Sequence, residues 1–295
     1  MAPPQVACGR VGNNNMKLAF STNAYTRHSL KDALAGIALA GFKGVEILAD
    51  TPHVYPEEMD VALARSVTAD LDRLNLTVSN INANCTFGYW KDAPPEPYFE
   101  PSLISPVDRY RADRIRMILK TIDFASAVGA ENISITSGRC LGGVPPARAA
   151  ELLRESLAPL LDRAASKNVR IGIELEPGLY LEYVDELKEW IDRLGSALFG
   201  ANLDIGHSVV IGETVDHAVS SLAGRIWNMH VEDLPGRKHY HMIPGEGTFD
   251  WNGLKRALTA IKYDRYLTVE LYTHTAAPQV AAEQSFAFLS GIFAE

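Results

Sequence analysis

Four side chains that could bind a metal ion stand at the ends of four successive apolar runs in the second half of the chain. They are Glu174, Asp204, His230 and Glu270. Three carboxylates cannot gather in a low-dielectric cavity without a large cost, and a divalent cation removes that cost. A single strand-end acid is more often a helix cap or an ion-pair partner, whereas four consecutive runs ending this way favour a metal site. Carboxylate and imidazole ligands suit one divalent cation, with Mn²⁺ favoured and Mg²⁺, Co²⁺ or Zn²⁺ as alternatives.

Short apolar runs alternate with longer amphipathic stretches along the chain. KLAFSTNAY (17–25) and GVEILAD (44–50) have the character of strands, and SLKDALAGIALAGF (29–42) between them has apolar residues at helical spacing. Eight such strand–helix units follow one another without a break in composition. They predict an α/β fold, a single (β/α)8 TIM barrel, because strands that alternate with helices imply a parallel sheet and eight such units in 295 residues fit a closed barrel better than an open one. The predicted catalytic domain covers 16–295, after a flexible leader at 1–15.

Three later segments carry specific expectations. PEEMDVALARSVTADLDRLN (56–75) is predicted as one helix, because it opens with proline and acids. LFGANLDIGH (198–207) is predicted as a strand that ends in both Asp204 and His207. The aromatic and proline-rich segment 86–107 is either a lid over the site or a packed surface loop.

The charge, apolar runs and cysteines of the chain limit the kinds of molecule and the cell compartment that we expect for it. The 295 residues carry a formal net charge of −8, which repels phosphodiester backbones and argues against nucleic acid as a partner. No apolar run is long enough to cross a membrane. The cysteines Cys8, Cys85 and Cys140 are odd in number and match no zinc spacing, so we expect a reduced, cytoplasmic protein. No P-loop is present, and no dinucleotide fingerprint follows the first strand.

An ordered set of short motifs resembles the xylose isomerase-like barrel superfamily over about residues 16–290. The motifs are GFKGVEI, IGIELEPG, NLDIGH, MHVED, PGEGTFDW and TVELY. That superfamily includes sugar and sugar-phosphate isomerases and epimerases, ketose 3-epimerases, inosose dehydratases and the endonuclease IV type. The resemblance implies the same four metal ligands that strand position suggested.

The similarity to ketose 3-epimerases implies a reaction. Glu174 and Glu270 would act as a catalytic acid–base pair that moves a proton next to a carbonyl, through a metal-stabilised enediolate. The expected substrate is a sugar, a sugar phosphate or a cyclitol. The alternatives are a metal-dependent lyase or dehydratase on an oxidised sugar or cyclitol, an endonuclease IV-type phosphodiesterase, and a non-catalytic sugar binder. Proteins that resemble this chain are commonly homodimers or homotetramers.

The resemblance also implies residues that contact substrate. His207 lies three residues after Asp204, as in the D-x-x-H of the family, and Glu182 resembles an acidic contact residue, although two extra residues intervene. Glu46 and Asn23 occupy typical superfamily positions at the barrel mouth, and Asn82 could hydrogen-bond a polyol. The alternative for all three is a hydrogen-bond network around the ligands.

Two further histidines precede PGEG in the string KHYHMIPGEG. In the endonuclease branch a similar pair completes a zinc site together with the position that matches His207. A second metal bound by His207, His239 and His241 is therefore one alternative, and substrate contact by His241 is the favoured one. A full trinuclear centre is disfavoured, because the third and fourth strands offer asparagine, serine and threonine where that branch has histidines.

Overall fold

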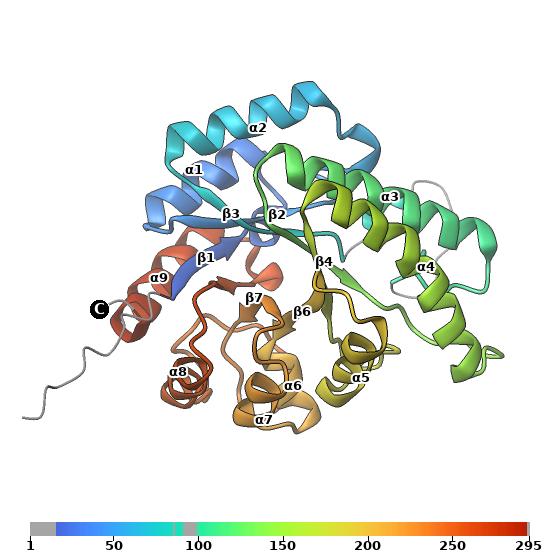
Figure 1. Ribbon diagram of the computed structural model, residues 1–295. Helices are drawn as coiled ribbons and strands as arrows, with labels where there is room; N and C mark the ends of the chain where they lie inside the picture. Colours follow the sequence, from blue (N-terminus) through green and yellow to red (C-terminus); the bar gives the residue numbers. More distant parts are fainter. Residues whose placement is uncertain (1–15, 85, 91–98, 294–295) are drawn as a thin grey trace, which may run out of the picture.

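Eight parallel strands close into a barrel in sequence order, with the first strand paired to the last (Figure 1). The computed structural model describes residues 16–84, 86–90 and 99–293. The barrel confirms the predicted (β/α)8 fold. The predicted leader at 1–15 lies outside the described residues, and so does Cys85.

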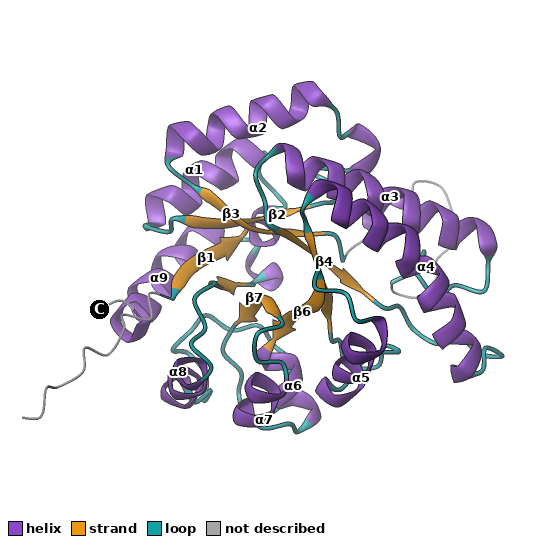
Figure 2. Cartoon of the chain, in the orientation of Figure 1, coloured by secondary structure: helices purple, strands orange, loops and turns teal. Residues whose placement is uncertain are grey.

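The strands are short, and most of their residues are buried between the barrel interior and the surrounding helices (Figure 2). They are β1 (Lys17–Ser21), β2 (Gly44–Leu48), β3 (Thr77–Asn82), β4 (Asn132–Thr136), β5 (Arg170–Glu174), β6 (Phe199–Asp204), β7 (Ile226–Val231) and β8 (Tyr266–Val269). Strands β5 and β6 end at Glu174 and Asp204, whereas β7 ends one residue after His230 and β8 ends one residue before Glu270.

Nine α-helices are found within the described residues. They are α1 (Leu30–Ala40), α2 (Val61–Leu74), α3 (Asp108–Ala127), α4 (Pro146–Lys167), α5 (Val184–Leu194), α6 (Ile205–Ile211), α7 (Val215–Ser221), α8 (Trp251–Ala260) and α9 (Pro278–Phe293). Short 3-10 turns cover Thr22–Tyr25, Pro56–Glu58, Phe87–Tyr89 and Tyr272–His274. None of these helices is long and apolar enough to span a membrane.

Two predicted elements have different bounds, and an aspartate cap explains each difference. The helix predicted over 56–75 is interrupted, because Asp60 accepts the Leu63 N–H at 2.7 Å and starts α2 afresh. The strand predicted over 198–207 ends at Asp204, whose carboxylate accepts the His207 N–H at 3.0 Å. His207 therefore lies in the first turn of α6 and not at the end of a strand.

The aromatic segment 86–107 is packed at both of its described ends. The Tyr89 hydroxyl donates to Asp113 at 2.7 Å, and the Trp90 indole N–H donates to the Glu100 carbonyl at 2.7 Å. Residues 91–98 lie outside the described part of the chain. A lid function for this segment stays a prediction.

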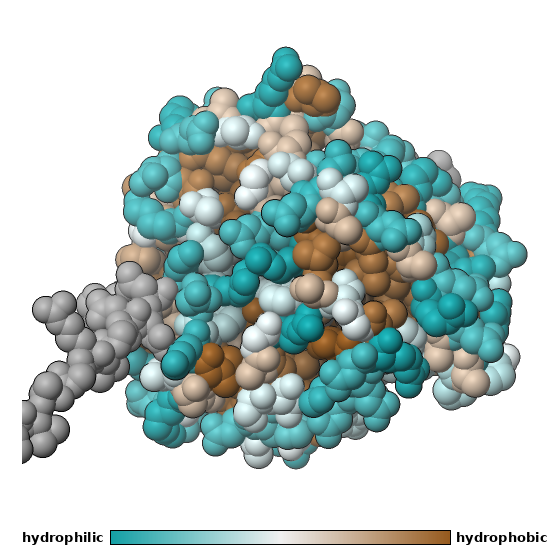
Figure 3. Space-filling view, viewed as in Figure 1, coloured by the Kyte–Doolittle hydropathy of each residue, from teal (hydrophilic) through white to brown (hydrophobic). Residues whose placement is uncertain are grey.

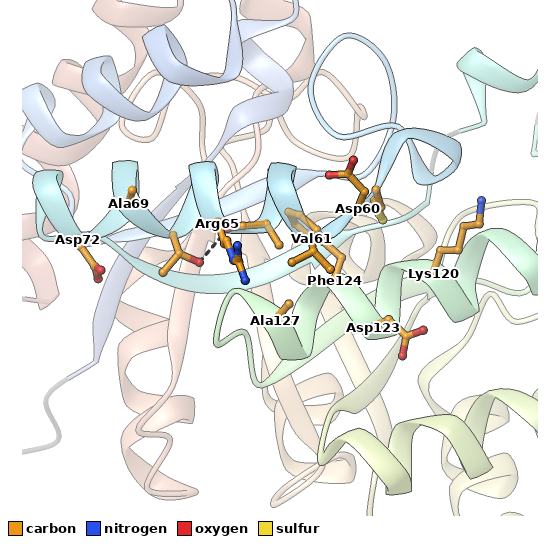
Figure 4. A pocket seen from close by; sticks show the side chains of 12 residues that line it. Asp60, Val61, Arg65, Ala69, Asp72, Lys120, Asp123, Phe124 and Ala127 are labelled. Carbon is orange, nitrogen blue, oxygen red and sulfur yellow. Dashed lines mark hydrogen bonds between the residues drawn. The ribbon is translucent and has the colours of Figure 1, made fainter.

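Charged and polar residues cover much of the face in Figure 3, with apolar side chains visible in the hollows between helices. One groove on this helical layer lies between α2 and α3 and has a volume of about 680 Å³ (Figure 4). Val61, Ala64, Phe124 and Ala127 contribute to its apolar lining. The groove includes no residue from the ends of the strands, so the candidate site must be sought at the barrel mouth.

Candidate metal centre

The four predicted ligands meet at the carboxyl ends of β5 to β8. One ligand atom from each of Glu174, Asp204, His230 and Glu270 lies within 4.8 Å of all the others, and all four residues are buried. The register of β6 and β7 pairs Asp204 with His230. The Oδ2 atom of Asp204 is buried without a hydrogen-bond partner. Three carboxylates, one imidazole and this unsatisfied oxygen fit a divalent cation.

His230 stands among carboxylates on both of its ring nitrogens. Nε2 lies 2.6 Å from Glu46, and Nδ1 lies 3.3 Å from Glu174 and 3.6 Å from Glu270. Burial opposes a charged imidazole, but these carboxylates outweigh it and raise the pKa of His230 well above its usual value. The centre therefore favours positive charge at this position.

Amide side chains from the other half of the barrel hold the ligand carboxylates. Asn84 donates to Glu174 at 2.7 Å, whereas Asn23 and Asn82 donate to Glu270 at 2.8 and 3.2 Å. Burial among other carboxylates still raises the pKa of Glu270 well above its usual value. The amides cannot ionise, so they are donors at any pH.

Glu46 lies behind His230 on β2 and is fully buried. Besides His230, its carboxylate accepts from Asn80 at 2.7 Å and from Asn82 at 3.2 Å. Burial alone would raise the pKa of Glu46, but His230 and the amide donors lower it. Glu46 and Asn82 thus form part of the network around the ligands, and their contact with a substrate stays a prediction.

Three histidines form a second cluster at the mouth. Ligand atoms of His207, His239 and His241 lie within 4.8 Å of one another. The Nδ1 atoms of His207 and His241 lie 2.7 and 2.8 Å from the backbone carbonyls of Leu175 and Glu270. Since a carbonyl only accepts, both Nδ1 atoms carry the proton. Nε2 of His241 lies 2.6 Å from Nε2 of His239.

The surroundings of His207 and His241 shift their pKa values in opposite directions. Burial opposes charge on His207, but Asp204, Glu176 and Glu174 raise its pKa to about 9. Burial, aided by two neighbouring histidines, lowers the pKa of His241 to about 3. The same cluster therefore shifts two imidazole pKa values in opposite directions, and perturbed pKa values of this kind cluster at functional sites.

Two further acids, the half-buried Glu176 and the fully buried Glu232, belong to the same mouth, although the sequence alone predicts no role for them. Glu176 lies with Glu174 and His207, and burial raises its pKa to about 7. Glu232 lies with Asp204 and His241. Glu176 comes two residues after the predicted ligand Glu174, and Glu232 comes two residues after the predicted ligand His230. This spacing places side chains on one face and could have revealed both acids.

Asp233, next to Glu232, has a structural role. Its carboxylate accepts the backbone N–H groups of Gly245 and Phe249 at 2.8 and 3.0 Å and the Trp251 indole N–H at 3.0 Å. These bonds fix the loop that carries His239 and His241. Trp251 is buried at the start of α8 and belongs to neither cluster of ligand atoms.

Glu182 lies in the loop after β5, away from the clusters of ligand atoms. Its carboxylate accepts the Gly178 N–H at 2.9 Å, and the residue is half-buried. Within the described ranges it belongs to no group of adjacent metal-binding side chains. Its contact with a substrate stays a prediction.

Fold and site together define a TIM barrel whose carboxylates and imidazoles converge at the mouth where such barrels carry their active sites. The chain belongs to the xylose isomerase-like TIM barrel family, whose model matches residues 34–292.

Named relatives point to sugar and cyclitol chemistry. The chain is 23% identical to fructoselysine 3-epimerase of Shigella flexneri over 92% of this chain and 95% of that protein. It is also 23% identical to inosose dehydratase of Clostridium perfringens, over 88% of this chain and 90% of that protein. The fold is similar to a crystal structure of the IolI protein with a bound zinc atom, at a TM-score of 0.76 and 16% identity, covering 94% of this chain and 98% of that one.

Proposed function

We propose that this chain is a divalent-metal-dependent isomerase or epimerase that acts on a sugar, a sugar phosphate or a cyclitol. The single observation that supports it most is the convergence of three buried carboxylates and one buried imidazole within 4.8 Å. A binding protein for neutral sugars has no need of that donor set. The family and the named epimerase relative support the same class of reaction.

The proposed ligands are Glu174, Asp204, His230 and Glu270. A bound divalent cation supplies positive charge against the negative charge that develops on a substrate oxygen. Glu174 and Glu270 are the proposed catalytic acid–base pair, which removes a proton beside the carbonyl and returns one. Their amide donors, Asn84 and Asn23, hold each carboxylate in one orientation.

The proposed substrate contacts lie around that pair. They are His207, His241, Glu182, Asn82 and Glu46. Nε2 of His207 lies 3.4 Å from Asp204, so a sugar hydroxyl bound beside the ligands would be within reach of this imidazole. A second metal on His207, His239 and His241 is the alternative use of the same nitrogens. The preference for manganese, the cytoplasmic location and the homodimer or homotetramer stay predictions.

Elemental analysis of the purified protein tests the metal centre, and exchange with solvent deuterium tests the reaction. We expect about one divalent ion per chain, and incorporation of deuterium at the carbon next to the carbonyl of each active substrate. Turnover of a substrate without any exchange would reject proton transfer.

A dehydratase is the second candidate, and the inosose dehydratase relative favours it. Removal of the same proton followed by loss of a hydroxyl would release water, so product masses separate the two reactions. An endonuclease-type activity is disfavoured by the net charge of −8, and a nicking assay on abasic DNA tests it.

A further inference from the structure

We propose that Arg114 of α3 is a positioning residue, which fixes the amide of Asn84 against the carboxylate of Glu174. This inference rests on the proposed metal centre, in which Glu174 is a ligand. The Nη2 atom of Arg114 donates to the backbone carbonyls of Ala83 and Asn84 at 2.6 and 3.2 Å. The Asn84 side chain in turn donates to Glu174 at 2.7 Å. Two successive sets of hydrogen bonds thus connect an outer helix to a proposed ligand.

Arg114 occupies a place that an apolar residue normally takes. It lies on the buried face of α3, four residues before Ile118 and eight before Ile122, and is only 2% exposed. A charged side chain costs more to bury than an apolar one of similar volume, so packing alone does not account for an arginine here. The buried charge has an acidic neighbour, because Arg114 opposes the rise that burial causes in the pKa of Asp50.

Asn84 lies beyond the end of β3, where the sheet no longer determines the path of the backbone. The strand ends at Asn82, and the Ala83 N–H still donates to the Ser134 carbonyl of β4 at 3.1 Å. Buried carbonyls need a donor, and Arg114 is a donor to the carbonyls of both Ala83 and Asn84. These bonds fix the orientation of two consecutive peptide groups, which determines where the Asn84 amide points.

Cobalt binding tests the proposal, because the visible spectrum of bound Co²⁺ reports ligand geometry independently of activity. Arg114→Lys keeps the positive charge but loses the rigid, planar guanidinium group that reaches both carbonyls. We expect the Kd for Co²⁺ to rise about 5-fold, with the same change in spectrum that Asn84→Ala produces. Arg114→Gln, which is neutral and shorter, is a second variant with the same expected change. Circular dichroism establishes that each variant is folded at the temperature of the measurement.

A double-mutant cycle separates positioning from a general loss of structure. If Arg114 acts through Asn84, then Arg114→Lys should raise the Kd by less than about 2-fold in the Asn84→Ala background. Arg111→Lys is the matched control. Arg111 lies on the same helix and also donates to a backbone carbonyl, that of Ser105 at 2.7 Å, but Ser105 lies in the segment before the helix and not at a strand end. Its substitution should leave the spectrum and the Kd unchanged.

Three outcomes would overturn the inference. A wild-type spectrum and Kd in both Arg114 variants would show that Asn84 needs no anchor. Additive losses in the double variant would show that Arg114 affects the centre by another route, and an equal loss in Arg111→Lys would show a general effect of loosening α3. Absence of cobalt binding in the wild-type protein would instead remove the proposed function. The state of the wild-type protein therefore distinguishes failure of the metal centre from failure of this contact alone.

Discussion

The two halves of the barrel contribute different chemistry to the same mouth. The half from β5 to β8 supplies the groups that change charge: Glu174, Glu176, Asp204, His230, Glu232 and Glu270. The half from β1 to β4 supplies mostly neutral amides: Asn23, Asn80, Asn82 and Asn84, with Glu46 as its one acid in the network around His230. The proposed ligands thus come from one half, and the donors that orient them come largely from the other, with Asn202 of β6 as a further amide donor to Glu174.

Closure of the barrel brings the amide donors of the first half next to the carboxylates of the second half. Asn23 and Glu270 are 247 residues apart in sequence, yet pairing of β1 with β8 brings them to 2.8 Å. Fixed donors opposite the ligands hold the carboxylates before any cation arrives, which lowers the cost of ordering them on binding. Each half can therefore be perturbed separately.

The largest expected effect comes from the ligand half. Glu174→Gln keeps the shape of the side chain but removes a charged ligand. Metal affinity should fall by about 10-fold or more, and turnover by about 10²- to 10⁴-fold. Metal content and initial rates measure the two effects. The surface variant Glu155→Gln is the control, and full metal content in Glu174→Gln would contradict the assignment.

Removal of a donor from the other half should weaken the centre without abolishing it. Asn84→Ala deletes the 2.7 Å bond to Glu174, and we expect metal affinity to fall by about 10-fold. Asn84→Gln keeps an amide donor and should lose less affinity than Asn84→Ala. Competition with a chelator measures both affinities. An Ala variant that binds metal as tightly as the wild-type protein would show that orientation by a donor is unimportant.

Substitution of Asp233 tests a contribution to the stability of the fold that does not depend on the metal. Asp233→Ala leaves three backbone N–H groups and one indole N–H without their acceptor. The free energy of unfolding should fall by about 2–4 kcal/mol, as measured by urea denaturation of the metal-free protein. Arg148→Ala, which breaks exposed ion pairs, should change it by less than about 1 kcal/mol. Equal effects would deny Asp233 its structural role.

The smallest effect is expected at Glu182, which belongs neither to the proposed ligands nor to their amide donors. Glu182→Gln should leave metal content unchanged and raise KM about 5-fold with an unchanged kcat, the result of losing one substrate hydrogen bond. Steady-state kinetics measure it. A loss of metal would place Glu182 in the centre, contrary to its contact with Gly178.

The sequence was sufficient to predict the barrel and the convergence of four side chains, because apolar runs mark strands and strand ends mark the mouth. Neither the pairing of Asn84 with Glu174 nor that of Asn23 with Glu270 could be predicted. Both depend on the register between strands, and the pairing of β2 with β3, the strand before Asn84, shifts between Val45 and Glu46. Such irregularities arise from packing around the whole barrel and leave no local pattern.

The start of α6 was missed for a different reason. Asp204 was interpreted only as a strand-end ligand, although an aspartate three residues before His207 is also a helix cap. One residue performs both tasks here, so the two interpretations were not alternatives. Glu176 and Glu232 needed only consistent use of the two-residue strand period.

His207 and His241 each donate a hydrogen bond from Nδ1 to a backbone carbonyl, which leaves only Nε2 of each ring for proton transfer. With Nδ1 committed to a carbonyl, a proton can be gained or lost only at Nε2. Under the proposed substrate contacts, a sugar hydroxyl would meet rings whose orientation is already fixed by the backbone. Discrimination between stereoisomers would then depend on where the hydroxyl lies, since the rings themselves cannot adjust to it.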